Sequence, residues 1–356
     1  EDCRRQRQMC IRDRSSISAI IRARAIPVLV DSDQTLGVDP EDLKVKISER
    51  TKVIMVVPML GGSSKIGEIM EVVRNVNNSR KKDNLSKIFV LEDCAQSLGA
   101  HAFGIPGSSQ TSLPEGCYKL GTFGDIGTFS LQLNKDITAG EGGMVVTRDK
   151  ELNDRVDALH NAGYIKKEKN NINWYGDIPY GWGHGRRMSE LQGAVARVQL
   201  KKLDSILDSI RKNHSFFEEF FKTQGIKLRK RAYQNNSGDT GYYLCFHLPE
   251  NLDDNTAISK GREIAKDLKD KGFNVWFLHD FEVHIYYNIE PLVKKFPMND
   301  GSPWEDPKNS FHTQYKYDRG ALPNLDHLLI RTIGLNMPSK MSDNTRDNMM
   351  NDLLVT

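Results

Sequence analysis

Short, uninterrupted apolar runs alternate with helical segments over the first 150 residues, and this alternation most restricts what the chain can fold into. The runs lie at 25–30, 52–58, 88–91, 126–131 and 144–147. Residues 65–76 between them carry apolar side chains at helical spacing. Because a strand without polar alternation must be buried on both faces, the pattern predicts a mostly parallel sheet flanked by helices. We therefore expect an α/β protein that binds ligands at the carboxyl ends of its strands.

The second half of the chain has a different pattern. A long apolar stripe over 188–221 predicts one helix that leads out of the first unit. Strand-like segments at 241–248 and 273–278 then flank a helical segment at 258–271. With 356 residues the chain also exceeds what one core usually supports. We predict a large domain over 15–205 and a smaller α+β domain over 206–356.

The first fourteen residues do not have a protein-like pattern. They are rich in arginine, lack an initiator Met, and contain no apolar segment of the kind a secretory signal needs. We expect residues 1–14 to be a non-native or disordered arm, and the large domain to be truncated at its N-terminus.

Composition excludes several classes of protein. Fifty Lys and Arg against forty-seven Asp and Glu leave a net charge of +3, which is too balanced for a nucleic-acid-binding protein. The apolar runs are too short to span a bilayer. Five cysteines without a C-x-x-C pair predict neither a disulfide framework nor a zinc site. We expect a cytoplasmic protein with no membrane or nucleic-acid partner.

Three features in order along the large domain suggest a chemistry. Asp93 ends an apolar run and Gln96 follows it, Ser130 precedes Lys135 by five residues, and glycines surround Glu141. Taken singly, Asp93 is more often a helix cap, Ser130 a small strand residue and Lys135 a solvated lysine. Gln96 alone fits a surface residue and a ligand-binding residue equally well. Together they are the parts that pyridoxal phosphate needs: an amine for a Schiff base, an acid for the ring nitrogen, and a hydroxyl for the phosphate.

The same motifs carry a family resemblance. Residues 93–100, 121–143 and 187–192 resemble the DegT/DnrJ/StrS sugar aminotransferases, which are fold-type I pyridoxal-phosphate enzymes. Residues 129–135, with 181–183 and 319–323, resemble a subgroup that includes the 8-amino-3,8-dideoxy-manno-octulosonate transaminase. The resemblance implies transamination of a ketosugar, nucleotide-linked or free, with glutamate as amino donor. It also implies a homodimer and a role in making amino sugars for surface polysaccharides or secondary metabolites.

The resemblance assigns roles to individual residues. Lys135 is expected to bind the cofactor covalently and to shuttle the proton. Asp93 is expected to pair with the ring nitrogen, Gln96 with the ring 3-oxygen, and Ser130 with the phosphate. Arg186 would supply a phosphate contact in place of the asparagine usual two positions before the Arg-Met pair, although a solvated surface arginine fits equally well.

The small domain offers a candidate substrate surface. His284 and Tyr286 belong to its densest group of His and Tyr residues, and polar aromatic side chains suit a hydroxylated sugar. Partly buried aromatics at a domain seam are an equal alternative. We expect no metal site, because no third ligand accompanies His279 and His284. The competing function is a non-catalytic regulator or sensor with the same fold, or an inactive fragment of the enzyme.

Overall fold

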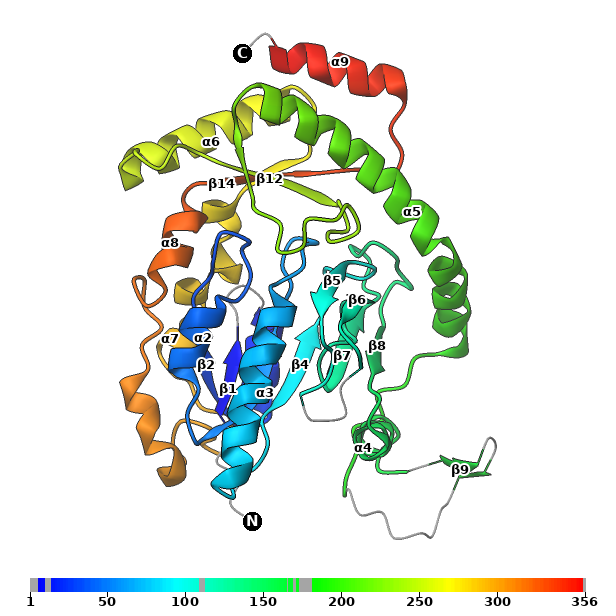
Figure 1. The fold of residues 1–356 in the computed structure, drawn as a ribbon, viewed down its shortest axis with the longest axis vertical. Helices are drawn as coiled ribbons and strands as arrows, with labels where there is room; N and C mark the ends of the chain where they lie inside the picture. The colour runs from blue at the N-terminus through cyan, green and yellow to red at the C-terminus, as the bar shows by residue number, and fades with distance from the viewer. Residues whose placement is uncertain are drawn as a thin grey trace.

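The structure is a computed structural model that describes residues 6–9, 14–108, 113–164, 166–168, 171–172 and 181–354. Its centre is a six-stranded sheet, shown in Figure 1, in the order β2-β1-β3-β4-β7-β8. The strands are β1 (Gln6–Met9), β2 (Ile26–Leu29), β3 (Thr51–Val56), β4 (Phe89–Asp93), β7 (Ile126–Ser130) and β8 (Gly143–Val146). Neighbouring strands pair in parallel as far as β7, and β8 pairs antiparallel with β7. The predicted mostly parallel α/β sheet is confirmed.

Strand β1 departs from the sequence prediction. Residues 1–14 were expected to lie outside the fold, but Gln6–Met9 pairs in parallel with both β2 and β3. The prediction is wrong for these four residues. Backbone N–H and C=O groups can complete a ladder whatever the side chains are, so an unusual composition did not exclude this stretch from the sheet.

Helices of the large domain cover the sheet. They are α1 (Arg14–Arg22), α2 (Pro40–Lys46), α3 (Ile66–Lys82) and α4 (Lys150–His160). Helix α3 buries Ile66, Ile69, Met70 and Val73, which recur at the helical spacing seen in the sequence. A hairpin of β5 (His101–Gly104) and β6 (Gly116–Lys119) packs beside α3, and β9 (Lys166–Glu168) pairs with β10 (Asn171–Ile172).

Helix α5 (Glu190–Thr223) connects the two units. It begins at a capping box in which Ser189 and Gln192 satisfy each other's backbone N–H groups. Figure 1 shows α5 running as a long arc from beside β8 to the smaller unit. There it buries Phe217 and Phe221 among apolar residues of the small domain.

The small domain is an antiparallel sheet with helices. Its strands follow the order β11-β12-β14-β13, and helices α6 (Asp254–Asp270) and α9 (Asp343–Leu354) accompany it. The strands are β11 (Lys227–Leu228), β12 (Tyr243–His247), β13 (Val275–Phe277) and β14 (Thr332–Asn336). The predicted smaller α+β unit is therefore present. No helix in the described part of the chain combines the length and apolar composition needed to cross a membrane.

The segment between β13 and β14 packs mainly with the large domain. It contains the 3-10 helices η1 (Leu278–His284), η2 (Tyr286–Asn288) and η3 (Pro307–Gln314), and the α-helices α7 (Glu290–Val293) and α8 (Pro323–Leu329). Its apolar side chains share one core with those of the central sheet, and the Tyr317 hydroxyl donates to the Pro27 carbonyl. The predicted division at residue 205 did not anticipate this return of the chain.

Candidate active site

A cavity of about 550 Å³ lies at the carboxyl ends of β4 and β7. Parallel α/β sheets bind ligands at this edge. Large-domain residues form most of the wall, and the small domain closes it. The lining residues are Ser15, Met59, Leu60, Asp93, Ala95, Gln96, Thr128, Phe129, Ser130, Gln132, Lys135, Tyr243, Phe281 and His284. Asp93, Gln96, Ser130 and Lys135, all singled out from the sequence, thus face one space.

The Asp93 carboxylate is held from two sides. Its Oδ2 accepts a hydrogen bond of 2.7 Å from the Ser16 hydroxyl, and its Oδ1 accepts one of 3.3 Å from the Ala95 N–H. The helix cap expected of a lone aspartate is not found, because no helix begins between β4 and β5, a stretch the structure describes in full, and the Ala95 N–H belongs to a turn. A carboxylate offers about four lone-pair sites, so it can accept several hydrogen bonds at once. Ser16 is buried, and nothing in the sequence motif identified it.

Lys135 reaches the cavity through a turn that follows β7. The Leu131 N–H donates to the Gly142 carbonyl and the Ala139 N–H donates to the Leu131 carbonyl, which closes the turn on itself. Leu131 and Ile137 are buried beneath it. Because β4 and β7 are neighbours, with Asp93 opposite Thr128, the turn carries Lys135 to the cavity that Asp93 also lines.

Asp136, next to the lysine, lies in an unusual environment. Burial raises the pKa of the Asp136 carboxyl to about 7, although the positive charges of Lys135 and Arg211 oppose this shift. A carboxyl group with a pKa near neutral therefore lies next to Lys135 in the chain. Perturbed carboxyl groups of this kind are enriched at functional sites.

Gln96 is oriented by the loop that follows β3. Its Oε1 accepts a hydrogen bond of 3.0 Å from the Leu60 N–H. With the carbonyl end engaged, the amide NH₂ remains as a donor toward a ligand. Met59 and Leu60, which also line the cavity, were not identified from the sequence. The adjacent glycines at 61 and 62 were the available signal for a special backbone, and Leu60 and Gly61 indeed have φ of 55° and 71°.

Aromatic side chains of the small domain form the opposite wall. Tyr243 and Phe281 line the cavity, and the Trp276 ring packs edge-on against both, at centroid distances of 5.7 and 5.2 Å. His284 also lines the cavity and is exposed, as a substrate contact would require.

Tyr286 does not reach the cavity, and the prediction that it contacts substrate is wrong. Its side chain is fully buried, and its hydroxyl donates to the two oxygens of Asp326 at 3.1 and 3.0 Å. Burial raises the pKa of this hydroxyl. The alternative drawn from the sequence, a partly buried aromatic residue at a domain seam, is nearer to the structure, although Tyr286 is fully buried in the core shared with the central sheet.

Arg186 also lies outside the cavity lining. It is exposed on the segment that precedes α5. Its expected phosphate contact involves a second subunit and stays a prediction. Within the described residues, no group of three or more His, Cys, Asp or Glu side chains could hold a metal ion.

The chain resembles known sugar aminotransferases. Residues 14–297 match the family model described as the DegT/DnrJ/EryC1/StrS aminotransferase family. A GDP-perosamine synthase of Escherichia coli O157:H7 is 36% identical over 194 residues, which are 54% of this chain and 45% of that protein. An L-glutamine:2-deoxy-scyllo-inosose aminotransferase of Streptomyces lividus is 28% identical, over 66% of this chain and 51% of its own. The chain thus spans about half the length of these curated relatives.

Solved structures agree on the fold. A sugar aminotransferase of Micromonospora echinospora superposes with a TM-score of 0.71 at 21% identity, over 99% of this chain and 80% of its own. An aminotransferase of Helicobacter pylori, described as involved in the biosynthesis of pseudoaminic acid, gives a TM-score of 0.70 at 18% identity, over 99% of this chain and 80% of its own.

Proposed function

Because the chain belongs to the DegT/DnrJ/EryC1/StrS aminotransferase family, we propose that it transfers an amino group to a ketosugar with pyridoxal phosphate as cofactor. One observation carries the proposal: Lys135 and Asp93 line the same cavity at the ends of adjacent parallel strands. The cofactor requires an amine for the Schiff base at its aldehyde and a carboxylate beside its ring nitrogen, and this pair offers both.

The groups present in the cavity suit the cofactor. Asp93 would hold the proton of the ring nitrogen, and the Gln96 amide NH₂ would donate to the ring 3-oxygen. Ser130, on the same wall, would donate its hydroxyl to the phosphate. Its Oγ accepts a hydrogen bond of 3.3 Å from the Gln132 N–H, which leaves the hydroxyl proton available. The bound cofactor supplies the electron sink that makes the amino-acid α-proton acidic.

Lys135 is the residue that moves protons. Its Nζ would attach the cofactor covalently. Once released, the amine would take the proton from the donor's α-carbon and deliver it to the cofactor carbon. The Asp93 carboxylate would stay oriented toward the ring because the Ser16 hydroxyl and the Ala95 N–H hold it in place.

The substrate is proposed by class. One relative is named as a GDP-perosamine synthase and another as an L-glutamine:2-deoxy-scyllo-inosose aminotransferase. His284, Phe281 and Tyr243 would contact such a ketosugar from the small domain. Glutamate is our proposed amino donor, and the product would enter amino-sugar and polysaccharide biosynthesis. We propose a reducing, cytoplasmic location, because the sequence has no C-x-x-C pair and no cysteine pattern of a disulfide framework.

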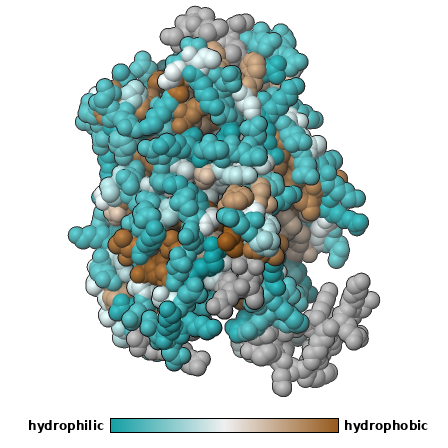
Figure 2. All heavy atoms as spheres, in the orientation of Figure 1, coloured by the Kyte–Doolittle hydropathy of each residue, from teal (hydrophilic) through white to brown (hydrophobic). Residues whose placement is uncertain are grey.

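A homodimer is proposed from an apolar strip near the cavity. Leu191, Val195 and Val198 are 80%, 47% and 52% exposed and recur on one face of α5, while Val145 of β8 is 48% exposed. Figure 2 shows apolar patches among the hydrophilic surface on the side where α5 runs. A second copy covering this strip would remove it from water. It would also bring Arg186, on the adjoining segment, toward the neighbouring subunit's phosphate.

Cofactor loading of Lys135 tests the proposal. Wild-type protein titrated with pyridoxal phosphate should develop the absorption band of a lysine Schiff base, and borohydride reduction should place the added mass on the peptide that contains Lys135. Lys135→Ala should lose both signals, while Lys150→Ala, which removes an exposed lysine on α4, should keep them. Labelling of other lysines only would refute the assignment.

Addition of glutamate then separates an enzyme from a non-catalytic binder. An enzyme should convert the band to that of the amino form of the cofactor and release 2-oxoglutarate. A regulatory or sensor protein would bind the cofactor in the first measurement and leave the band unchanged in the second. Glutamine and alanine, tested in the same way, would identify a different donor.

A further inference from the structure

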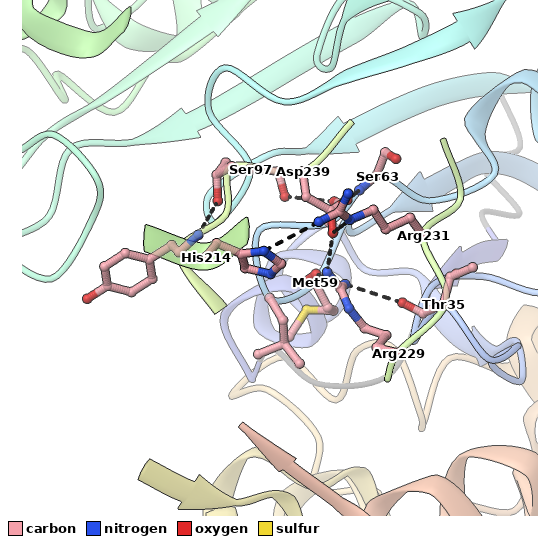
Figure 3. Close-up of polar contacts among 12 residues, drawn as sticks. Thr35, Met59, Ser63, Ser97, His214, Arg229, Arg231 and Asp239 are labelled. Carbon is pink, nitrogen blue, oxygen red and sulfur yellow. Dashed lines mark hydrogen bonds and ion pairs between the residues drawn. The ribbon is translucent and has the colours of Figure 1, made fainter. Parts of the chain in front are cut away.

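A buried ion-pair network joins the small domain to the loop beside the cavity. Figure 3 shows the Arg229 and Arg231 guanidinium groups around the Asp239 carboxylate. The Arg229 and Asp239 side chains form a direct ion pair and are each only 5% exposed. Arg231 extends the network to Glu218 at 2.5 Å and to the His214 ring at 3.3 Å. The mechanism proposed above uses none of these residues.

Arg229 and Asp239 both contact the loop that follows β3. One Arg229 nitrogen donates to the Met59 carbonyl at 3.4 Å, and Asp239 Oδ1 accepts the Ser63 N–H at 3.3 Å. The Thr240 N–H donates to the Gly61 carbonyl at 2.8 Å. The small domain therefore holds this loop, residues 58–63, at three backbone positions.

The large domain contacts the same loop through Ser97. The Ser97 hydroxyl donates to the carbonyls of Pro58 at 2.8 Å and Gly62 at 3.2 Å. Inside the loop, the Gly62 N–H donates to the Met59 carbonyl at 3.0 Å. Backbone groups buried at this seam are thus paired, which fixes the path of the loop.

The loop's conformation needs these contacts. Leu60 is not a glycine, yet it has a φ of 55°, a region that L-residues enter at a cost and keep only when their surroundings impose it. Gly62 approaches Arg229 so closely that a Cβ at position 62 would lie 2.2 Å from its guanidinium nitrogen. The guanidinium therefore packs directly on the loop, and a shorter side chain would leave this space empty.

Leu60 connects the loop to the cofactor cavity. Its N–H is the group that engages Gln96 Oε1, and its side chain lines the cavity. The direction of the Leu60 N–H depends on the φ that the loop enforces. The contacts thus run in sequence from Arg229 and Asp239 through the loop to the Gln96 amide.

We propose that Arg229 and Asp239 are positioning residues for the cofactor: they fix the loop 58–63 so that Leu60 turns the Gln96 amide NH₂ toward the cavity. This inference rests on the proposed function, because it assigns Gln96 to the cofactor's 3-oxygen. It also makes the small domain part of the cofactor site without any contact between Arg229 and the cofactor.

A double-mutant cycle tests the coupling. The dissociation constant for pyridoxal phosphate is measured by absorbance titration for wild type, Arg229→Gln, Gln96→Ala and the double variant. We expect Arg229→Gln to weaken binding about tenfold in the wild-type background and less than twofold when Gln96 is already alanine. The pH at which the Schiff-base band changes should also move in Arg229→Gln, since the 3-oxygen loses a fixed donor.

Two further variants keep the test decisive. Arg331→Gln is the matched control: its side chain is also 5% exposed and donates to backbone carbonyls, of Leu252 and His327, but it does not contact the loop. It should lose stability yet bind the cofactor within twofold of wild type. Arg229→Lys preserves a charge opposite Asp239 and folds if Arg229→Gln does not, and its single amine cannot bridge both partners as the guanidinium does.

The outcomes separate this inference from the proposed function. Equal fold-changes for Arg229→Gln in both backgrounds, or an equal loss of cofactor affinity in Arg331→Gln, would mean a structural role only and would overturn the inference. Wild-type affinity in both Arg229 variants would overturn it as well. A wild-type protein that never forms the Lys135 band would instead refute the proposed function itself.

Discussion

Glu92, the residue before Asp93, offers a sharp test of how the site is built. It is fully buried in β4, and its carboxylate accepts hydrogen bonds from the N–H groups of Gly121 at 2.8 Å, Phe123 at 2.7 Å and Gly124 at 2.7 Å. These residues form the turn that leads into β7, the strand that positions Ser130 and the turn to Lys135. Glu92 therefore ties together the two strands that supply the cavity.

Glu92→Gln changes one acceptor into a donor at almost constant shape. Oε1 can keep the bonds to residues 123 and 124, but the amide NH₂ would face the Gly121 N–H. One buried N–H then lacks an acceptor, which costs roughly 1–3 kcal/mol. Burial raises the pKa of Glu92 despite the three N–H donors, so loss of the charge offsets part of the weakened bonds. We expect a net loss of about 1–3 kcal/mol.

Urea unfolding near neutral pH measures this difference. The control is Glu115→Gln, which makes the same chemical change at an exposed position and should stay within about 0.5 kcal/mol of wild type. Stability of Glu92→Gln equal to or greater than that of wild type would refute the reasoning, because the turn would then not depend on a charged acceptor.

Two further predictions concern Gly127, in β7, and Asp136, next to Lys135. A Cβ at Gly127 would lie 2.1 Å from the Gly121 carbonyl oxygen, so Gly127→Ala should destabilise the protein by about 1–3 kcal/mol. The control Gly193→Ala, in open space on α5, should be neutral or stabilise the protein by up to about 1 kcal/mol. Thermal unfolding compares the two variants, and equal midpoints would contradict the predicted clash. The folded-state pKa of Asp136, about 7, lies above its ordinary 3.8, so ionisation destabilises the fold as pH rises between these values. Asp136→Asn should therefore gain about 1–3 kcal/mol relative to wild type between pH 5 and pH 8, and a pH-independent difference in urea unfolding would rule this out.

Local patterns predicted the parts of the site that depend on strand order. The apolar runs at 88–91 and 126–131 became β4 and β7, and both bury side chains in the sheet. Because parallel strands end at one edge, a carboxylate after the first and an amine shortly after the second can line one cavity. Asp93 and Lys135 do share a cavity, although the strands are separated in sequence by the β5–β6 hairpin.

Features that depend on long-range packing were not predictable in this way. His284 and Tyr286 are two residues apart, but Ile285 between them is buried and the chain turns through a 3-10 helix, so only His284 faces the cavity. The return of 278–329 to the large-domain core has no periodic signal either, because short helices and turns bury isolated side chains. Ser16 was overlooked since a hydroxyl in a helix has no distinguishing pattern.

The two domains supply different kinds of residues to the cavity, which explains why the cavity lies between them. In the proposed mechanism the large domain supplies Asp93, at the end of β4, and Lys135, on the turn that follows β7. The small domain would orient the loop 58–63 through Arg229 and Asp239, and we propose that Phe281 and His284, which line the cavity, contact the sugar. Motion of the small domain would therefore change the Gln96 amide and the sugar-facing wall together, while leaving the distance between Asp93 and Lys135 unchanged. Such a site can close on a substrate without disturbing the residues that hold and move the proton.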